Sequence, residues 1–203
     1  MAGKTIDFIF DFGSPNAYLA LPPLRDVAGK HGAEINLVPC LLGGIFKATG
    51  NQAPMMANAG IKGKNEYMML EMRRFIEKHG FTRFAMNPHF PVNTLLAMRA
   101  MVAARHRGEE AAYVDAVLKA MWEDGEKMDD AQVFVAVLDR AELDGAALAE
   151  AAQDQAVKDE LAANTAEAVE RGAFGIPTFF IGSEMFFGKD RIEQIDEWLQ
   201  ESA

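Results

Sequence analysis

The chain has 203 residues, of which 50% are hydrophobic and 25% are charged; this is the balance of an ordinary soluble globular protein, not of a disordered, collagen-like or coiled-coil one. Asp and Glu outnumber Lys and Arg by 30 to 20, so the formal net charge is −10, and an acidic surface argues against a nucleic-acid partner. The single cysteine, Cys40, excludes an intramolecular disulfide, a CxxC redox pair and a zinc site built from several thiolates.

The chain begins with a pattern typical of a strand–helix–strand unit. Apolar residues alternate with others along Thr5–Phe12, which predicts a strand. Ser14 followed by Pro15 is typical of a helix start, because a hydroxyl can cap the first turn and proline suits its first position. This helix is expected to end at Gly32, and the apolar stretch Ile35–Leu42 predicts a second strand, which completes a βαβ unit.

The middle of the chain, from Gly43 to about Gly172, predicts helices, because Ala, Met, Leu, Glu and Arg dominate it. Gly43-Gly44 and Gly50–Pro54 are typical of loops. Many of the 12 methionines lie in this part, and the simplest interpretation is adaptable core filling. The expected helices are Asn65–His79, Asn93–His106, Gly108–Asp124, Asp130–Ala141, Gly145–Gln153 and Val157–Arg171.

The end of the chain returns to strands. Gly175–Gly182 predicts a strand, Ser183-Glu184 a tight turn and Met185–Gly188 a returning strand, so the pair is interpreted as a hairpin. Apolar residues at helical spacing from Ile192 to Leu199 predict a final helix. The order β-α-β, helices, β-β-α is that of an α/β, thioredoxin-like fold with a large all-helical insertion. We expect 1–45 and 173–203 to form the thioredoxin-like domain and 46–172 the helical insertion.

Two local motifs strengthen the prediction of a thioredoxin-like fold. In such folds the reactive group lies where the first helix begins, and here Ser14 occupies that position, in Ser14-Pro15-Asn16-Ala17. Gly175-Ile176-Pro177-Thr178 places a proline at the start of a strand, which is the usual setting of the cis-proline in this fold. We therefore expect Ile176–Pro177 to be a cis peptide bond.

At this point the sequence resembles the 2-hydroxychromene-2-carboxylate isomerase family, which is grouped with kappa-class glutathione transferases and DsbA-like thioredoxin folds. Five blocks in the family's order carry the resemblance and span nearly the whole chain. They are Asp11–Ala20, Leu42–Asn51, Asn87–Thr94, Phe174–Thr178 and Phe187–Arg191.

The resemblance implies a glutathione-dependent isomerase of aromatic catabolism. In that family the glutathione thiolate adds to a chromene-derived acid, the adduct opens and rotates, and the thiol leaves to give trans-o-hydroxybenzylidenepyruvate. Glutathione is regenerated, which agrees with the lack of a cysteine pair. Two alternatives stay open: a kappa-like transferase acting on electrophiles, and a non-catalytic thioredoxin-fold module that binds partners along its cis-proline edge.

Ser14 is the candidate catalytic residue. A free thiol with a pKa near 8.5 is only about 3% thiolate at pH 7. A hydroxyl that donates a hydrogen bond to the sulfur, together with the positive end of a helix, favours the anion. A pKa lowered by about two units, or roughly 2.7 kcal/mol, would raise the thiolate to about three quarters. Ser14 could instead simply cap its helix, and both roles could coexist.

The resemblance also implies residues that hold glutathione. Ile176 would offer backbone groups to the cysteinyl portion, as a strand edge does, or merely pack in the core. Lys64, or the neighbouring Lys62, could pair with a glutathione carboxylate, and Asp190 could bind the γ-glutamyl ammonium or cap a helix. The expected cofactor-binding residues are Lys64, Ile176, Pro177, Phe187, Gly188, Lys189 and Asp190.

An aromatic acid needs a cation for its carboxylate and an aromatic wall with a few polar groups for its ring. The candidates are Lys47, Asn51, Asn87, Phe90 and Asn93, although Asn51 and Asn93 could equally form turns or cap helices. We expect no metal and no membrane span, because neither metal-ligand spacing nor a long apolar stretch occurs. No signal sequence is visible from Met1 to Thr5, so a cytoplasmic location is the expectation, and the resemblance suggests a homodimer.

Overall fold

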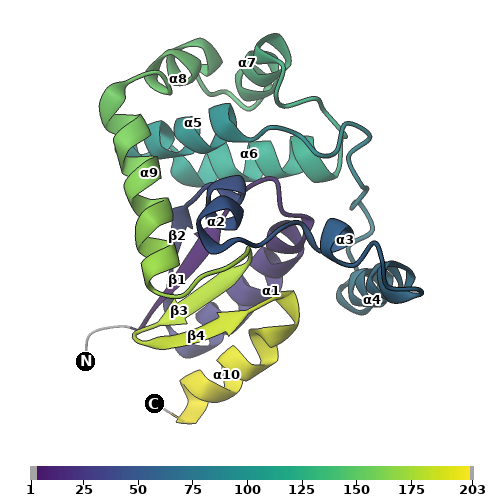
Figure 1. Cartoon of the computed structure of the whole chain (residues 1–203). Helices are drawn as coiled ribbons and strands as arrows, with labels where there is room; N and C mark the ends of the chain where they lie inside the picture. The colour runs from purple at the N-terminus through teal and green to yellow at the C-terminus, as the bar shows by residue number, and fades with distance from the viewer. Residues whose placement is uncertain (1–3, 202–203) are drawn as a thin grey trace.

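The computed structural model describes residues 4–201 (Figure 1). Residues 1–3 and 202–203 lie outside the described residues. They are the two ends of the predicted thioredoxin-like domain, and residues 1–3 also belong to the N-terminal segment in which no signal sequence is visible. The elements are β1 (Thr5–Phe10), α1 (Pro15–His31), β2 (Glu34–Pro39), α2 (Leu42–Thr49), α3 (Pro54–Ala57), α4 (Lys64–His79), α5 (Leu95–His106), α6 (Glu110–Trp122), α7 (Ala131–Arg140), α8 (Gly145–Ala151), α9 (Gln155–Glu170), β3 (Thr178–Ile181), β4 (Glu184–Phe187), the 3₁₀ helix η1 (Lys189–Arg191) and α10 (Ile192–Glu201).

The four strands form one mixed sheet in the order β2-β1-β3-β4. β1 runs parallel to β2, which requires the α1 crossover between them, and antiparallel to β3. β3 and β4 form the expected hairpin, in which Ile181 pairs with Glu184, so the turn is Gly182-Ser183 and not Ser183-Glu184. Gly182 has a φ of 61°, a conformation that glycine adopts without steric cost. This arrangement confirms the predicted thioredoxin-like fold with a helical insertion.

A ladder of aromatic rings forms the centre of the core. The centroids of Phe8 and Phe179 lie 4.7 Å apart on adjacent strands, and Phe10 and Phe12 continue the row at 5.5 and 5.0 Å. Tyr113 of α6 joins it 5.9 Å from Phe12. All five side chains are buried, so the ladder binds the sheet to the helices inserted between β2 and β3.

Helices cover both faces of the sheet. Successive residues of a strand point to opposite faces, and both Phe179 and Phe180 of β3 are buried. α1 and α10 pack against each other, whereas α9 packs against β2, α2 and α5. Between residues 4 and 201, none of the helices combines the length and the apolar character that a bilayer crossing requires.

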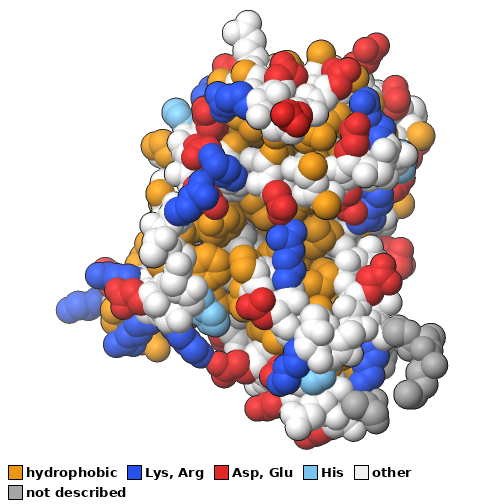
Figure 2. All heavy atoms as spheres, turned by 180° about the vertical axis from the view of Figure 1, so that it is seen from behind, with side chains coloured by type: hydrophobic (Ala, Val, Ile, Leu, Met, Phe, Trp, Pro, Cys, Tyr) orange, Lys and Arg blue, Asp and Glu red, His pale blue; other side chains and the backbone are white. Residues whose placement is uncertain are grey.

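One part of the insertion projects from the body, at the right of Figure 1. We call α3, α4 and their connection, residues 54–79, the arm. Only Met72 of α4 is buried, and Met55 and Met56 of α3 are 50% and 68% exposed. Figure 2 shows the arm as a lobe rich in Lys and Arg, beside a hollow lined by hydrophobic side chains. The core-filling interpretation of the methionines is wrong for α3 and correct for α5 and α6, where Met98, Met101 and Met121 are buried.

The largest difference from the predicted elements is α2. The predicted strand Ile35–Leu42 ends at Pro39, and Leu42 instead begins a helix that contains Gly43 and Gly44, which were expected in a loop. Glycine disfavours helices, but a Cβ on Gly44 would lie 3.1 Å from Thr165 Cγ2. The missing side chain of Gly44 therefore lets α2 approach α9 closely, and sequence propensity alone does not reveal that contact.

Candidate active site

The turn after β1 presents Ser14 at the start of α1. Ser14 has extended backbone angles (φ −97°, ψ 111°), and its Oγ accepts a hydrogen bond from the Ala17 N–H at 3.3 Å. Pro15 occupies the first helical position, where its missing N–H costs nothing. The capping role weighed for Ser14 is therefore present, and it leaves the hydroxyl proton free for another acceptor.

That acceptor is the carbonyl oxygen of Ile176, to which the Ser14 Oγ donates at 3.0 Å. The peptide bond between Ile176 and Pro177 is cis, as predicted. Two motifs 162 residues apart in sequence thus meet through one buried hydrogen bond. The Ile176 carbonyl therefore already has a hydrogen-bond partner within the protein.

The end of β4 lies against the same proline. The Gly188 N–H donates to the Pro177 carbonyl at 3.0 Å, and Gly188 has a φ of 103°. The ring of Phe187 lies over Gly175, where an added Cβ would come within 3.0 Å of it, and its centroid is 4.4 Å from that of Phe174. The structure therefore brings Phe187, Gly188 and the cis-proline together, with a half-exposed aromatic pair beside them.

Lys189 has a partner within the protein. Its side chain is only 5% exposed, its Nζ lies 2.7 and 3.0 Å from the two carboxylate oxygens of Glu71 in α4, and it sits 4.8 Å above the Phe75 ring. The ion pair with Glu71 therefore joins the arm to the segment that follows β4. Asp190, the next residue, is exposed and pairs with Arg191 at 3.2 Å; its side chain caps neither η1 nor α10.

Lys64 is the first residue of α4 and is exposed, with Tyr67 one turn later. It follows Gly63, whose φ is 82°, and Lys62 lies in the turn just before. The structure places this candidate on the arm, whereas Ser14 lies at the start of α1.

Two of the candidate residues for binding the aromatic acid lie at the C-terminal end of α2. Lys47 is exposed in the last turn of α2. Asn51 follows that helix, and its Nδ2 donates to the Phe174 carbonyl at 2.8 Å, so it links α2 to the segment before the cis-proline. This contact holds Asn51 close to the cis-proline segment whose Ile176 carbonyl accepts from Ser14.

The remaining candidates divide into two groups. Asn93 is exposed and its Oδ1 accepts from the Leu95 N–H at 3.0 Å, as a residue at a helix start does. Phe90 is 39% exposed, with its ring 6.1 Å from that of Trp122. The structure does not bring Asn87 to a binding surface: it is buried, and its amide donates to the carbonyls of Met121 and Glu126 and accepts from the His89 N–H. Its side-chain amide is therefore fully engaged in hydrogen bonds that fix the loop around Asn87 against the end of α6.

Sequence reasoning missed Asp11, which was assigned to the first strand. Asp11 is 2% exposed and accepts hydrogen bonds from the Leu42 N–H, the Gly13 N–H and the Thr94 hydroxyl, at 2.8, 2.8 and 2.7 Å. Burial raises the pKa of its carboxyl, and the three donors oppose that shift. The signal in the sequence was a charged residue between Phe10 and Phe12, immediately before a glycine.

Cys40, the residue that follows β2, is buried. Burial, and to a smaller degree the charge of Asp11, raise the pKa of its thiol to about 12. A thiol with this pKa stays protonated at neutral pH, so Cys40 supplies no nucleophile. Within the described part of the chain, no cluster of three or more His, Cys, Asp or Glu side chains could hold a metal ion.

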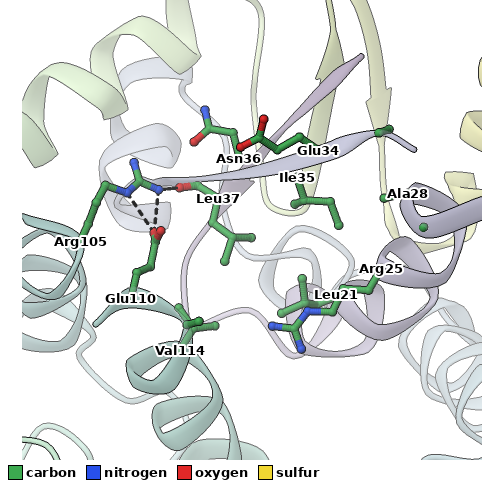
Figure 3. A pocket seen from close by; sticks show the side chains of 13 residues that line it. Leu21, Arg25, Ala28, Glu34, Ile35, Asn36, Leu37, Arg105, Glu110 and Val114 are labelled. Atoms are coloured by element: carbon green, nitrogen blue, oxygen red, sulfur yellow. Dashed lines mark hydrogen bonds and ion pairs between the residues drawn. The ribbon is translucent and has the colours of Figure 1, made fainter. Parts of the chain in front are cut away.

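A cavity of about 540 Å³ lies elsewhere, between α1, α6 and the outer edge of β2 (Figure 3). Arg105 spans its wall: it donates to the Leu37 carbonyl and pairs with Glu110 at 2.6 Å. Arg25 at its rim pairs with Asp115 at 3.1 Å. The candidate residues identified from the sequence are not among those that line this cavity, so it is separate from the Ser14 site.

Comparison with known proteins adds independent information. Residues 5–200 match the family model described as a DSBA-like thioredoxin domain. The chain is 30% identical over 194 residues to a 2-hydroxychromene-2-carboxylate isomerase of Pseudomonas putida, covering 94% of this chain and 92% of that protein. It is 27% identical to glutathione S-transferase kappa 1 of Rattus norvegicus, covering 95% and 89%. A solved 2-hydroxychromene-2-carboxylate isomerase structure superimposes with a TM-score of 0.83 at 27% identity, over 97% of this chain and 95% of that one.

Proposed function

The chain belongs to the DSBA-like thioredoxin family and, within it, to the 2-hydroxychromene-2-carboxylate isomerases, and from that premise we propose that it is a glutathione-dependent isomerase of an aromatic acid. The proposed substrate is of the 2-hydroxychromene-2-carboxylate type, and the product is trans-o-hydroxybenzylidenepyruvate. The names of the relatives support an isomerase, and the kappa-class relatives supply the connection with glutathione.

One observation carries the proposal: a buried serine hydroxyl at a helix start lies 3.0 Å from the carbonyl that precedes the cis-proline. A strand edge at a cis-proline suits the extended backbone of a cysteinyl residue, and the hydroxyl lies beside it. No cysteine shares that turn, so the fold presents a hydrogen-bond donor where a disulfide oxidoreductase would need a thiol. These residues fit glutathione as a cofactor.

When bound, glutathione would supply a thiolate nucleophile for reversible addition to the chromene-derived acid, without net oxidation or reduction. Ser14 stabilises the anion by turning its proton from the Ile176 carbonyl to the sulfur, while its lone pair keeps accepting from Ala17. The N-terminal dipole of α1 acts in the same direction. Because Ser14 is buried, little water competes for that hydrogen bond.

The rest of the tripeptide is proposed to bind on either side of this point. The Ile176 N–H binds the cysteinyl carbonyl, and the exposed carboxylate of Asp190 binds the γ-glutamyl ammonium. Lys64 on the arm binds a terminal carboxylate. Lys189 acts indirectly, because its ion pair with Glu71 sets the position of the arm.

The aromatic acid is proposed to bind between α2 and the start of α5. Lys47 pairs with its carboxylate, and Phe90 offers an apolar surface to the ring. Asn51 and Asn93 shape this region through hydrogen bonds from their side chains to the backbone of other residues. We do not propose a substrate contact for Asn87, because its amide is buried and satisfied.

A second candidate function is glutathione transfer to an electrophile, which the kappa-class relatives favour. The two functions differ in product. An isomerase returns free glutathione and interconverts the chromene acid with its open isomer, whereas a transferase accumulates a thioether from a halonitroarene.

The decisive test is Ser14→Ala. At pH 7 we expect the thiolate absorbance of bound glutathione near 240 nm to fall and turnover of the chromene acid to drop about 25-fold, which corresponds to a thiol pKa about two units higher. Loss of the helix cap should lower the free energy of unfolding by only about 1 kcal/mol.

The matched control is Ser183→Ala, the same change at an exposed turn between β3 and β4; it should leave both signals at their wild-type values. The proposal fails if calorimetry detects no glutathione binding, or if Ser14→Ala binds glutathione with an unchanged thiolate absorbance. Thioether accumulation without isomerisation would select the transferase.

A further inference from the structure

We infer that Asp11 is a positioning residue of the site: its buried carboxylate fixes the starts of α2 and α5 against the Ser14 turn and thereby sets where the carboxylate of the aromatic acid binds. The identity of the substrate in this inference rests on the proposed function, whereas the contacts of Asp11 rest on the structure alone. Asp11 is the first residue after β1 and is almost fully buried.

Asp11 supplies the cap that α2 lacks. The N-cap residue of α2, Leu41, has an apolar side chain that makes no capping hydrogen bond. The Leu42 N–H instead donates to Asp11 Oδ2 at 2.8 Å, and this acceptor lies 31 positions earlier in the sequence. A negative charge at this end also complements the helix dipole. Because two glycines follow directly and weaken the helix, the direction of α2, and with it Lys47, depends on this contact.

Asp11 also holds the start of α5. Thr94 occupies the N-cap position of that helix, yet its hydroxyl makes no cap and donates to Asp11 Oδ1 at 2.7 Å. The preceding residue, Asn93, provides the local hydrogen bond to Leu95. A threonine diverted from its own helix is the structural sign that the Asp11 contact determines where α5 begins relative to β1.

The third contact reaches the Ser14 turn. The Gly13 N–H donates to Asp11 Oδ1 at 2.8 Å, and the Ser14 N–H donates to the Asp11 backbone carbonyl at 3.1 Å. The space is tight, because a Cβ on Gly13 would lie 3.3 Å from both Asp11 Oδ1 and Thr94 Cγ2. One side chain therefore ties the proposed thiolate-stabilising residue to both elements that border the proposed acid site.

The chemistry of the three donors explains why the residue is a carboxylate. An ionised carboxylate accepts hydrogen bonds at both oxygens, whereas an amide of the same shape accepts at one and donates at the other. In Asp11→Asn, one of the two oxygens is replaced by an NH₂ group, so at least one of the three donors would face another donor. A buried donor without an acceptor lowers the stability of the fold. The substitution therefore loosens the junction while changing its volume very little.

The experiment compares Asp11→Asn with Asp130→Asn, a matched change at the N-cap of α7, where Asp130 accepts from Gln132 and Val133. We expect hydrogen exchange at the amides of Leu42–Ile45 to accelerate about tenfold in Asp11→Asn, in line with one lost hydrogen bond. The KM for the chromene acid should rise about tenfold, with kcat and the thiolate absorbance of bound glutathione near wild type. Asp130→Asn should change none of these.

Thr94 provides a second route if Asp11→Asn does not fold. Thr94→Val removes one donor and should reproduce the KM effect in part, whereas Thr94→Ser keeps the hydroxyl and should restore the wild-type value. Unchanged exchange at α2 in Asp11→Asn, or altered exchange with an unchanged KM, overturns the inference. If the wild-type protein neither ionises glutathione nor converts the acid, the proposed function fails and takes the substrate role of Asp11 with it, while the exchange result still decides whether Asp11 holds α2.

Discussion

The end of β1 and the arm are built in opposite ways. Around Ser14 and Asp11, buried hydrogen bonds join residues far apart in sequence and leave little exposed surface. The arm buries only Met72 of α4 and reaches the body through the Lys189–Glu71 and Lys78–Glu193 ion pairs. Segments with few buried contacts open most easily. The comparison indicates that the groups proposed for chemistry are held rigidly, whereas the proposed carboxylate-binding Lys64 stands on an adjustable element.

The largest effect should come from the core beneath the rigid side. Phe179→Ala removes a fully buried ring of the aromatic ladder and should lower the free energy of unfolding by about 3–5 kcal/mol. Met72→Ala, a truncation of the buried residue of α4, should lower it by about 2 kcal/mol, the lower end for such a change, because the arm can shift to fill the space. Urea denaturation followed by circular dichroism measures both. Equal losses would show that the arm is packed as firmly as the sheet.

The two ion pairs of the arm should differ in strength. Lys189 is 5% exposed, whereas the side chains of Lys78 and Glu193 are 62% and 77% exposed. Lys189→Met leaves Glu71 without its buried partner and should cost about 1–3 kcal/mol, with faster hydrogen exchange along α4 and a higher KM for glutathione. Lys78→Met should cost less than about 1 kcal/mol. The same loss in both variants would contradict the distinction.

The smallest effect is in the pH dependence of stability, where the two regions should have opposite signs. Burial raises the pKa of Asp11 above 3.8, so the folded protein holds that proton more tightly than the unfolded chain. Relative to Asp11→Asn, the wild type should gain stability as the pH falls through the raised pKa towards 3.8, with no further gain below it.

Glu193 should behave in the opposite sense. Lys78, by hydrogen bond and by charge, lowers the pKa of its carboxyl below 4.5. Relative to Glu193→Gln, the wild type should therefore keep its added stability above pH 4.5 and lose it as the pH falls through the lowered pKa. Thermal melts of both pairs between pH 3 and 7 measure the differences, and slopes of equal sign would refute the assignment.

The same contrast explains which elements could be predicted. α1 was predicted from Ser14 to Gly32 because its cap, its proline and its terminal glycine are all local, and each is found where expected. α2 could not be predicted, because its cap is Asp11, in the turn after β1, and its Gly44 is explained by the close approach to α9. Local signals specify an element when its partners lie within it.

The candidate site follows this rule as well. Ser14 and the cis-proline were identified because each has a recognisable neighbourhood in the sequence. Lys189 and Asn87 carry the right chemistry, but the Glu71 partner of Lys189 lies 118 positions away, and the carbonyls that accept from the Asn87 amide lie 34 and 39 positions away. The sequence alone does not reveal that these partners have already satisfied their side chains.

Arg105 affects whether the β2 edge of the sheet can pair with a strand of another molecule at high protein concentration. β2 is an edge strand of the sheet, and such edges offer unpaired carbonyls to strands of other molecules. Arg105 occupies the Leu37 carbonyl, and Pro39 has no N–H to offer. An incoming strand would have to displace a guanidinium that Glu110 also holds. The β2 edge therefore carries its own barrier against edge-to-edge pairing, away from the proposed Ser14 site.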